Sequence, residues 1–162
     1  MLNDITLHLE GEVATLACGA QFTRCLQAGL IVYLHGDLGA GKTTFVRGVL
    51  QGLGYVGKVK SPTYNLVEIY QLKSNTKELN VKYNYNIYHF DLYRFTSEDE
   101  WEAAGFRDYF NAQNICMIEW PEKAAHVLPQ ADIDLHLSIL DETRNIQMSA
   151  NTQLGRQCLE KL

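Results

Sequence analysis

Residues 30–45 are LIVYLHGDLGAGKTTF, and this stretch decides the fold. Residues 30–35 form a short apolar run with β-branched and aromatic members, which predicts a buried strand of the kind found in parallel sheets. Residues 36–43 match the pattern G-x-x-x-x-G-K-[ST], and residues 43–53 have a helical pattern interrupted by Gly48. The motif therefore follows a strand and opens a helix, which is the context expected of a phosphate-binding loop.

Each part of this motif has a physical task in binding phosphate. Its glycines let the backbone curl, so that successive N–H groups point inward as an anion-binding nest. The helix that begins near Lys42 adds the positive end of its dipole. Lys42 is predicted to neutralise the β- and γ-phosphate oxygens, and the hydroxyl of Thr43 is predicted to bind Mg²⁺.

A magnesium ion at Thr43 needs a carboxylate from the sheet, and two are available. Asp91 ends the apolar run 87–91 and Glu119 ends the run 115–119. Parallel strands that flank the motif strand point their carboxyl ends at the same crevice, so we expect both acids there. One acid could bind the ion directly while the other binds through water or orients the attacking water. Spacing alone leaves these roles unassigned.

Residues 60–63, Lys-Ser-Pro-Thr, lie between the motif helix and the next strand. In nucleotide switches a loop at this place offers a threonine hydroxyl or its backbone to the γ-phosphate and Mg²⁺. A plain β-turn before a strand is the equal alternative. Among the weaker features, His89 is interpreted as a packed histidine, Trp120 as a residue near the site mouth, and Arg94 as a surface arginine.

Outside the motif, strands alternate with helices early in the chain and pair with one another late, which predicts an α/β fold with antiparallel additions. The expected strands are 5–9, 30–35, 66–71, 87–91, 115–119, 133–140 and 145–150, and the expected helices are 12–28, 43–53, one capped by Ser97, a short one from Pro121 and one at the C-terminus. Residues 72–85, rich in lysine and asparagine, are expected to form a hairpin tip or excursion.

The length of 162 residues favours one domain spanning residues 1–162, and the net charge is −5. No apolar run is long enough to span a bilayer, and no secretory signal pattern is present, so no membrane partner is expected. The acidic balance argues against a broad nucleic-acid-coating surface, and no DNA partner is expected. Four cysteines without metal-ligand spacing predict reduced thiols in a cytoplasmic protein.

Five blocks in this order together resemble the TsaE family (formerly YjeE), small bacterial ATPases of tRNA threonylcarbamoyladenosine synthesis: GDLGAGKTTF (36–45), KSPTYNLVE (60–68), YHFDLYR (88–94), GFRDYF (105–110) and IEWPE (118–122). The resemblance implies a P-loop NTPase-like three-layer sandwich with a mostly parallel central sheet and antiparallel edge strands. It also implies that the chain acts with TsaB and with TsaD, which transfers the threonylcarbamoyl group to adenosine 37 of tRNAs reading codons that start with A. Contact with tRNA would be indirect, through that complex.

The same resemblance assigns site residues and the cofactors ATP and Mg²⁺. It implies that Mg²⁺ is held by Thr43 and Glu119, and that Asp91 and Thr63 form the catalytic or switch pair, with Lys42 as the third catalytic residue. The implied nucleotide-binding residues are Gly36, Asp37, Leu38, Gly39, Ala40, Gly41, Lys42, Thr43, Thr44, Arg144, His8 and Glu12.

Two other function classes compete with an ATPase subunit. A small-molecule P-loop kinase usually carries an arginine-bearing lid, whereas the excursion at 72–85 contains no arginine. A nucleotide-dependent interaction module would need binding but no turnover. Because no arginine is aimed by a motif at the γ-phosphate, hydrolysis by the isolated chain is expected to be slow and to be accelerated by partners.

Overall fold

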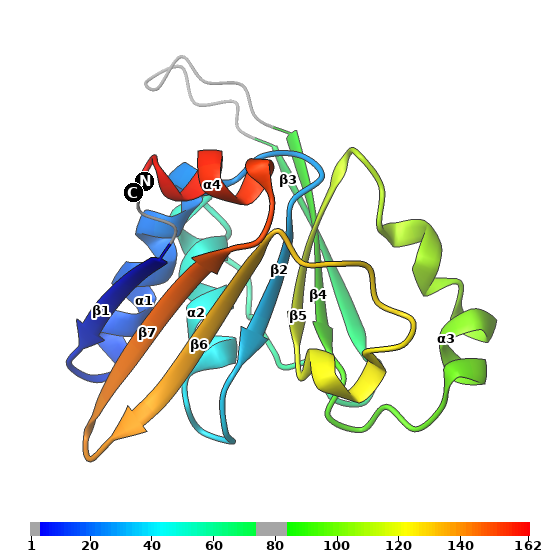
Figure 1. Cartoon of the computed structure of the whole chain (residues 1–162), viewed down its shortest axis with the longest axis horizontal. Coiled ribbons are helices and arrows are strands. Elements are labelled where there is room, and N and C mark those ends of the chain that lie inside the picture. Colours follow the sequence, from blue (N-terminus) through cyan, green and yellow to red (C-terminus); the bar gives the residue numbers. More distant parts are fainter. Residues whose placement is uncertain (1–3, 74–83) are drawn as a thin grey trace.

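A central sheet of seven strands organises the chain in the computed structural model, which describes residues 4–73 and 84–162 (Figure 1). The elements are β1 (Asp4–Leu9), α1 (Gly11–Phe22), η1 (Thr23–Cys25), β2 (Ile31–His35), α2 (Lys42–Gly52), β3 (Val67–Lys73), β4 (Asn84–Asp91), α3 (Glu98–Ala104), η2 (Phe106–Tyr109), β5 (Asn114–Glu119), η3 (Pro121–Ala124), β6 (Ile133–Leu140), β7 (Thr143–Ala150) and α4 (Gln153–Leu159).

The strand order across the sheet is β1-β7-β6-β2-β5-β4-β3. The four central strands β6, β2, β5 and β4 run parallel to one another, whereas antiparallel pairs add β7 and then β1 on one side and β3 on the other. Helices cover both faces of the sheet, with α1 and α2 on one and α3 on the other (Figure 1). The expected α/β architecture, with a mostly parallel centre and antiparallel edges, is confirmed.

Strand β5 shows why the two faces carry separate cores. All six of its residues are buried. Ile115 and Met117 pack into the cluster beneath α1 and α2, whereas Cys116 and Ile118 pack into the aromatic cluster beneath α3. Successive side chains of a strand point to opposite faces, so a continuous apolar run is what a strand covered on both faces requires.

Helix α2 continues through Gly48, although the sequence pattern suggested an interruption there. A Cβ atom at Gly48 would lie 2.3 Å from the backbone oxygen of Leu16, and one at Gly19 would lie 2.3 Å from the backbone oxygen of Phe45. The two glycines therefore let α1 and α2 approach more closely than side chains would permit. This contact fixes the helix that carries the phosphate-binding motif.

Three boundaries differ from expectation. The helix expected over 12–28 ends at Phe22, where the hydroxyl of Thr23 donates to the carbonyl of Ala20 at 2.6 Å and a short 3₁₀ turn follows. The β6–β7 turn is shorter than expected, because β7 already begins at Thr143 and Asp141 adopts a positive φ of 53°. Of the excursion at 72–85, the ends belong to β3 and β4, and residues 74–83 lie outside the described residues.

All four cysteines are free and buried, as expected for reduced thiols. Burial raises the pKa of the Cys116 thiol to about 12, so this group is protonated at neutral pH. Within the described ranges, no helix combines the length and apolar character needed to cross a bilayer.

Candidate functional site: a phosphate-binding loop between two strand-end carboxylates

The phosphate-binding motif forms the turn from β2 into α2. Gly41, the residue before the helix, has a φ of 104°, and Gly39 has a φ of 80°, both in the left-handed region that favours glycine. No side chain caps the first turn of α2. Its first backbone N–H groups have no partner within the helix, and together with the helix dipole they make a ready anion-binding site.

Lys42 is folded back over this turn. Its ammonium group donates to the carbonyl of Gly36 and, at 3.0 Å, to the carbonyl of Asp37. The indole of Trp120 covers the same group, with its ring centre 4.2 Å from Nζ. Only 5% of the residue is exposed. Burial lowers the pKa of Lys42, and the carboxylate of Glu119 is the strongest influence in the opposite direction.

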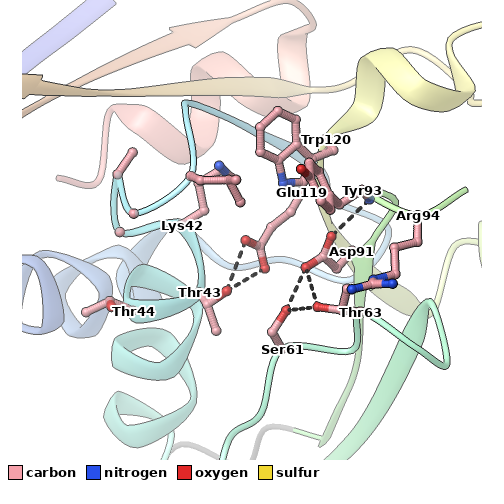
Figure 2. A pocket seen from close by; sticks show the side chains of 14 residues that line it. Lys42, Thr43, Thr44, Ser61, Thr63, Asp91, Tyr93, Arg94, Glu119 and Trp120 are labelled. Carbon is pink, nitrogen blue, oxygen red and sulfur yellow. Dashed lines mark hydrogen bonds between the residues drawn. The ribbon is translucent and has the colours of Figure 1, made fainter.

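Strand pairing brings the two strand-end acids side by side. Asp91 of β4 is in register with Glu119 of β5. Asp91 has the same parity along its strand as Ile87, and Glu119 the same as Met117, and both of these residues are buried beneath α1 and α2, so the two acids point to that face of the sheet. Figure 2 shows the Glu119 carboxylate directed at Thr43 of α2 and the Asp91 carboxylate directed at Ser61 and Thr63. The crevice predicted from the sequence therefore receives both acids.

Glu119 faces the helix directly. The hydroxyl of Thr43 donates to the carboxylate and lies 3.0 Å from each of its oxygens. Nε2 of His89 also lies 2.5 Å from Oε2 of Glu119, and both side chains are almost fully buried. One hydroxyl and one carboxylate are hard oxygen donors, so this pair fits a magnesium ion in the chemistry of its ligands.

Asp91 has a different set of partners (Figure 2). Its Oδ2 accepts from the hydroxyl of Ser61 at 2.6 Å and from the hydroxyl of Thr63 at 3.3 Å. Its Oδ1 accepts from the backbone N–H of Tyr93 at 3.0 Å. Asp91 thereby fastens the 61–63 loop to the end of β4. The two hydroxyls of this loop also lie 2.9 Å apart, so they form one small network.

These groups surround one cavity of about 370 Å³ beside the phosphate-binding loop. Its lining residues are Leu38, Gly39, Ala40, Gly41, Lys42, Thr43, Thr44, Ser61, Thr63, Asp91, Tyr93, Arg94, Glu119 and Trp120. Trp120 lies at this site, as expected. Arg94 also lines the cavity, with its guanidinium 4.8 Å from the ring centre of Tyr64, and it is exposed, as expected of a surface arginine.

A second cavity, of about 270 Å³, lies on the other side of the loop. Glu12 and Arg144 line it together with residues 39–41. Arg144 donates to the carbonyl of Gly39 at 3.3 Å, and Glu12 is paired with Arg47. His8 lines neither of these two cavities, and its ring pairs with Asn145 at 3.0 Å. Arg144, His8 and Glu12 were the predicted nucleotide-binding residues outside the motif, and the structure brings Arg144 and Glu12 to the loop.

Comparison with known proteins places this chain in a family. A model of the family described as threonylcarbamoyl adenosine biosynthesis protein TsaE matches residues 9–147. The chain belongs to the TsaE family. The tRNA threonylcarbamoyladenosine biosynthesis protein TsaE of Haemophilus influenzae is 44% identical over 98% of this chain and 97% of that protein. The TsaE protein of Bacillus subtilis is 37% identical over 75% of this chain and 70% of that protein.

A solved structure agrees with this membership. The crystal structure of YdiB from Bacillus subtilis superposes on the chain with a TM-score of 0.73 and 26% sequence identity. The match covers 99% of this chain and 95% of the YdiB chain. This chain and YdiB therefore share one fold over nearly the whole length of both.

Sequence reasoning missed two members of the site. Ser61 makes the shorter of the two hydroxyl contacts to Asp91, whereas the prediction named Thr63. His89 was interpreted as packed, and it is fully buried, but it is also the partner of Glu119. A signal was available for His89, because it lies two residues before Asp91 on a strand and therefore shares its face.

Proposed function

We propose that this chain is the magnesium-dependent subunit that binds and hydrolyses ATP in the threonylcarbamoylation of adenosine 37, in tRNAs reading codons that start with A. It would act with TsaB and TsaD. The observation that carries the proposal is the pairing of the Thr43 hydroxyl with the Glu119 carboxylate at the open first turn of α2. Membership of a family named for threonylcarbamoyladenosine biosynthesis supports the pathway.

The nucleotide phosphates would lie in the larger cavity, along the backbone of residues 36–44. Lys42 has to exchange its contacts with the Gly36 and Asp37 carbonyls for phosphate oxygens. That exchange moves the ammonium away from backbone dipoles toward full negative charges, and burial of the group strengthens the attraction. Arg144 and Glu12 border the smaller cavity, where they would contact the nucleoside portion.

Thr43 and Glu119 would hold the magnesium ion. When bound, the ion would neutralise charge on the phosphate oxygens and help to align them for transfer. His89 has a positioning task, because its hydrogen bond to Oε2 restrains the Glu119 carboxylate in addition to the contact from Thr43. A buried carboxylate fixed by two partners loses little conformational freedom when it takes up an ion.

Asp91 would couple the nucleotide to the 61–63 loop. One of its oxygens accepts both loop hydroxyls, and the other accepts a backbone N–H, so the carboxylate is held in one orientation. From there it can orient a water molecule toward the cavity or keep Thr63 beside it. Either task makes Asp91 important for turnover and less important for holding the ion.

Turnover by the isolated chain is expected to be slow. Arg94 lines the phosphate cavity but rests on the ring of Tyr64, and Arg144 donates to the carbonyl of Gly39. Tyr64 is 84% exposed and Leu38 is 64% exposed beside the same cavity. Exposed apolar groups at a site mouth favour a docking partner, which would order this rim and accelerate hydrolysis.

The decisive experiment reconstitutes the modification with purified TsaB, TsaD, tRNA and the threonylcarbamoyl donor. Modified tRNA should accumulate over several turnovers only with this chain and ATP, and a non-hydrolysable analogue should not replace ATP. Phosphate release should be measured in parallel, without any acceptor, for the chain alone and with saturating partners. Equal modification with the analogue would favour an interaction module, and phosphate release that requires a small-molecule acceptor would favour a kinase.

A further inference from the structure

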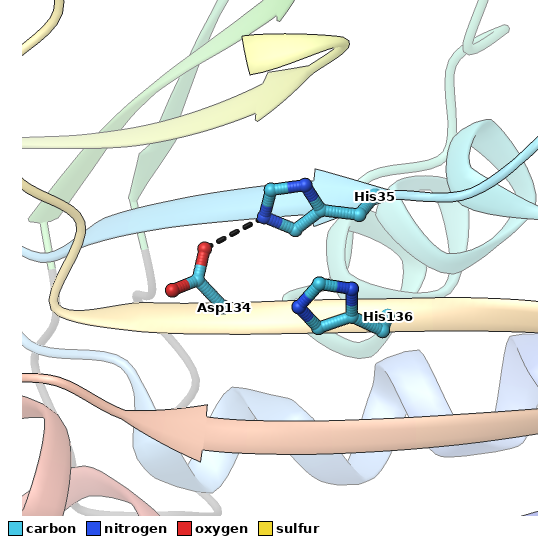
Figure 3. Close-up of side chains that lie close together, drawn as sticks. All are labelled: His35, Asp134 and His136. Carbon is cyan, nitrogen blue, oxygen red and sulfur yellow. Dashed lines mark hydrogen bonds and ion pairs between the residues drawn. The ribbon is translucent and has the colours of Figure 1, made fainter. Parts of the chain in front are cut away.

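A cluster of two histidines and one aspartate lies outside the site described above. It consists of His35, Asp134 and His136 (Figure 3). Each residue offers one ligand atom, and the three atoms all lie within 4.8 Å of one another. Nε2 of His35 is 2.7 Å from Oδ1 of Asp134. Figure 3 shows a ring nitrogen of each histidine on the side of the Asp134 carboxylate.

Strand register builds this cluster. His35 of β2 is paired with His136 of the parallel strand β6, and Asp134 is two residues before His136 on the same face. The intervening pair, Leu34 and Leu135, is fully buried in the core beneath α1 and α2. The three ligand-bearing side chains consequently lie on the opposite face of the sheet. Their relative placement depends on backbone pairing and is fixed by the fold.

The carboxylate and one imidazole are oriented by further contacts. Nδ2 of Asn151 donates to Oδ2 of Asp134 at 2.6 Å, which leaves Oδ1 directed at His35. The ring of Tyr33 meets the ring of His35 edge-on, with centroids 6.2 Å apart. Metal-binding carboxylates and imidazoles are commonly oriented by neighbours of this kind.

His136 is the exposed imidazole of the cluster. Its ring stacks on His35 with centroids 4.2 Å apart and an angle of 8° between the planes. Among the described residues it has no hydrogen-bond partner that would hold its ring in place.

We propose that His35, Asp134 and His136 bind one divalent transition-metal ion, with Zn²⁺ as the preferred class. Two imidazoles and a carboxylate suit zinc, whose ligand atoms in a tetrahedral site are about 3.4 Å apart. The three ligand atoms now lie within 4.8 Å of one another, and a rotation of the His136 ring would bring its nitrogen closer to the other two. Solvent or a ligand in the adjoining cavity, which is about 370 Å³ and is lined by His35 and Asp134, completes the coordination.

This site is separate from the magnesium site in place and in ligand chemistry, and it does not depend on the proposed function. His35 immediately precedes Gly36, the first residue of the phosphate-binding motif. An ion here would cross-link β2 and β6 where β2 leads into that loop. The expected consequence is a stabilised fold.

The test is a Co²⁺ titration of the full chain, stripped of metal with a chelator and kept in excess Mg²⁺. We expect visible absorption bands of a His-ligated Co²⁺ ion that saturate at one equivalent and are displaced by Zn²⁺. His136→Ala should weaken binding at least about tenfold. The matched control is His126→Ala, which removes an exposed histidine outside the cluster.

Thermal unfolding gives a second readout. Zn²⁺ at about 100 times its wild-type dissociation constant should raise the Tm of the wild type and of His126→Ala by about 5 °C or more, and the shift in His136→Ala should be at most about half as large. Equal Co²⁺ affinity in the two alanine variants would overturn the proposal. So would absorption that disappears in Glu119→Gln, or the absence of any one-equivalent binding, which would leave the cluster as an ion pair with a stacked neighbour.

Discussion

Strands β4 and β5 end side by side in two carboxylates, yet the two acids have different surroundings. Asp91 and Glu119 are in register and are both at most 5% exposed. Glu119 lies between the hydroxyl of Thr43 on α2 and the imidazole of His89. Asp91 instead accepts from two hydroxyls of the 61–63 loop and from a backbone N–H. Glu119 therefore contacts helix α2, whereas Asp91 contacts the 61–63 loop.

The difference arises from the position of each strand in the sheet. Strand β5 lies between β2 and β4, so the acid at its end is enclosed by elements of regular structure. Strand β4 borders the antiparallel strand β3, and the chain leading into β3 contacts its end, with the N–H of Asp91 donating to the carbonyl of Leu66 at 2.9 Å. The neighbouring element therefore separates the roles of two acids that look equivalent along the chain.

The largest effect is expected at Lys42, the cation whose charge both acids influence. Lys42→Ala should lower partner-stimulated phosphate release by roughly 10²–10³-fold, because a positioned charge at the phosphates is lost. The control is Lys58→Ala, which removes an exposed lysine outside both cavities. Circular dichroism should confirm that the variant is folded. Unchanged turnover in a folded Lys42→Ala chain would remove the argument from the phosphate-binding loop.

Neutralising each of the two acids in turn should separate their roles. Glu119→Gln should raise the Mg²⁺ concentration for half-maximal nucleotide binding by on the order of 100-fold, because a charge facing a divalent ion carries several kcal/mol. Asp91→Asn should change that concentration much less and should mainly lower turnover. Nucleotide binding titrated against Mg²⁺, together with phosphate release at saturation, measures both. The opposite ranking would exchange the two assignments.

The strand, loop and helix that carry this site could be predicted from the sequence because they depend on local patterns. The apolar run before Gly36, the spacing of the phosphate-binding motif and the helix after it are all short-range features, and the structure has them as expected. Strand ends were predictable within a few residues for the same reason. Helix α1 was predicted too long, because it gives way to a 3₁₀ turn at Thr23–Cys25 that the hydrophobic pattern does not reveal.

The pairing of side chains across strands was harder to predict from the sequence. Which acid faces Thr43 depends on the order β2-β5-β4, which the residue spacing does not encode. The cluster of His35 with His136 joins positions 101 residues apart through the register of β2 and β6. Such contacts depend on long-range pairing, so resemblance to a family suggested the first of them and residue patterns alone suggested neither.

His89 tests whether Glu119 depends on its second neighbour. His89→Leu removes the hydrogen bond to a buried carboxylate, which should reduce the free energy of unfolding by about 1–3 kcal/mol and weaken Mg²⁺ binding by about tenfold. His89→Gln, which keeps an N–H donor, should recover part of both losses. Denaturant unfolding and the same Mg²⁺ titration provide the measurements. A His89→Leu chain with unaltered Mg²⁺ dependence would show that Thr43 alone positions Glu119.

The smallest effects are expected in the loop held by Asp91, where the two hydroxyls differ in their contacts. Ser61 lies 2.6 Å from Oδ2 and Thr63 lies 3.3 Å from it, so Ser61 makes the stronger hydrogen bond. Ser61→Ala should lower phosphate release several-fold, about the effect of one hydrogen bond, and Thr63→Val should lower it less. Neither change should alter the Mg²⁺ dependence, since neither residue contacts Glu119. If Thr63→Val abolishes turnover while Ser61→Ala leaves it intact, then Thr63 acts on the nucleotide directly, and the loop contributes to the chemistry as well as to the placement of Asp91.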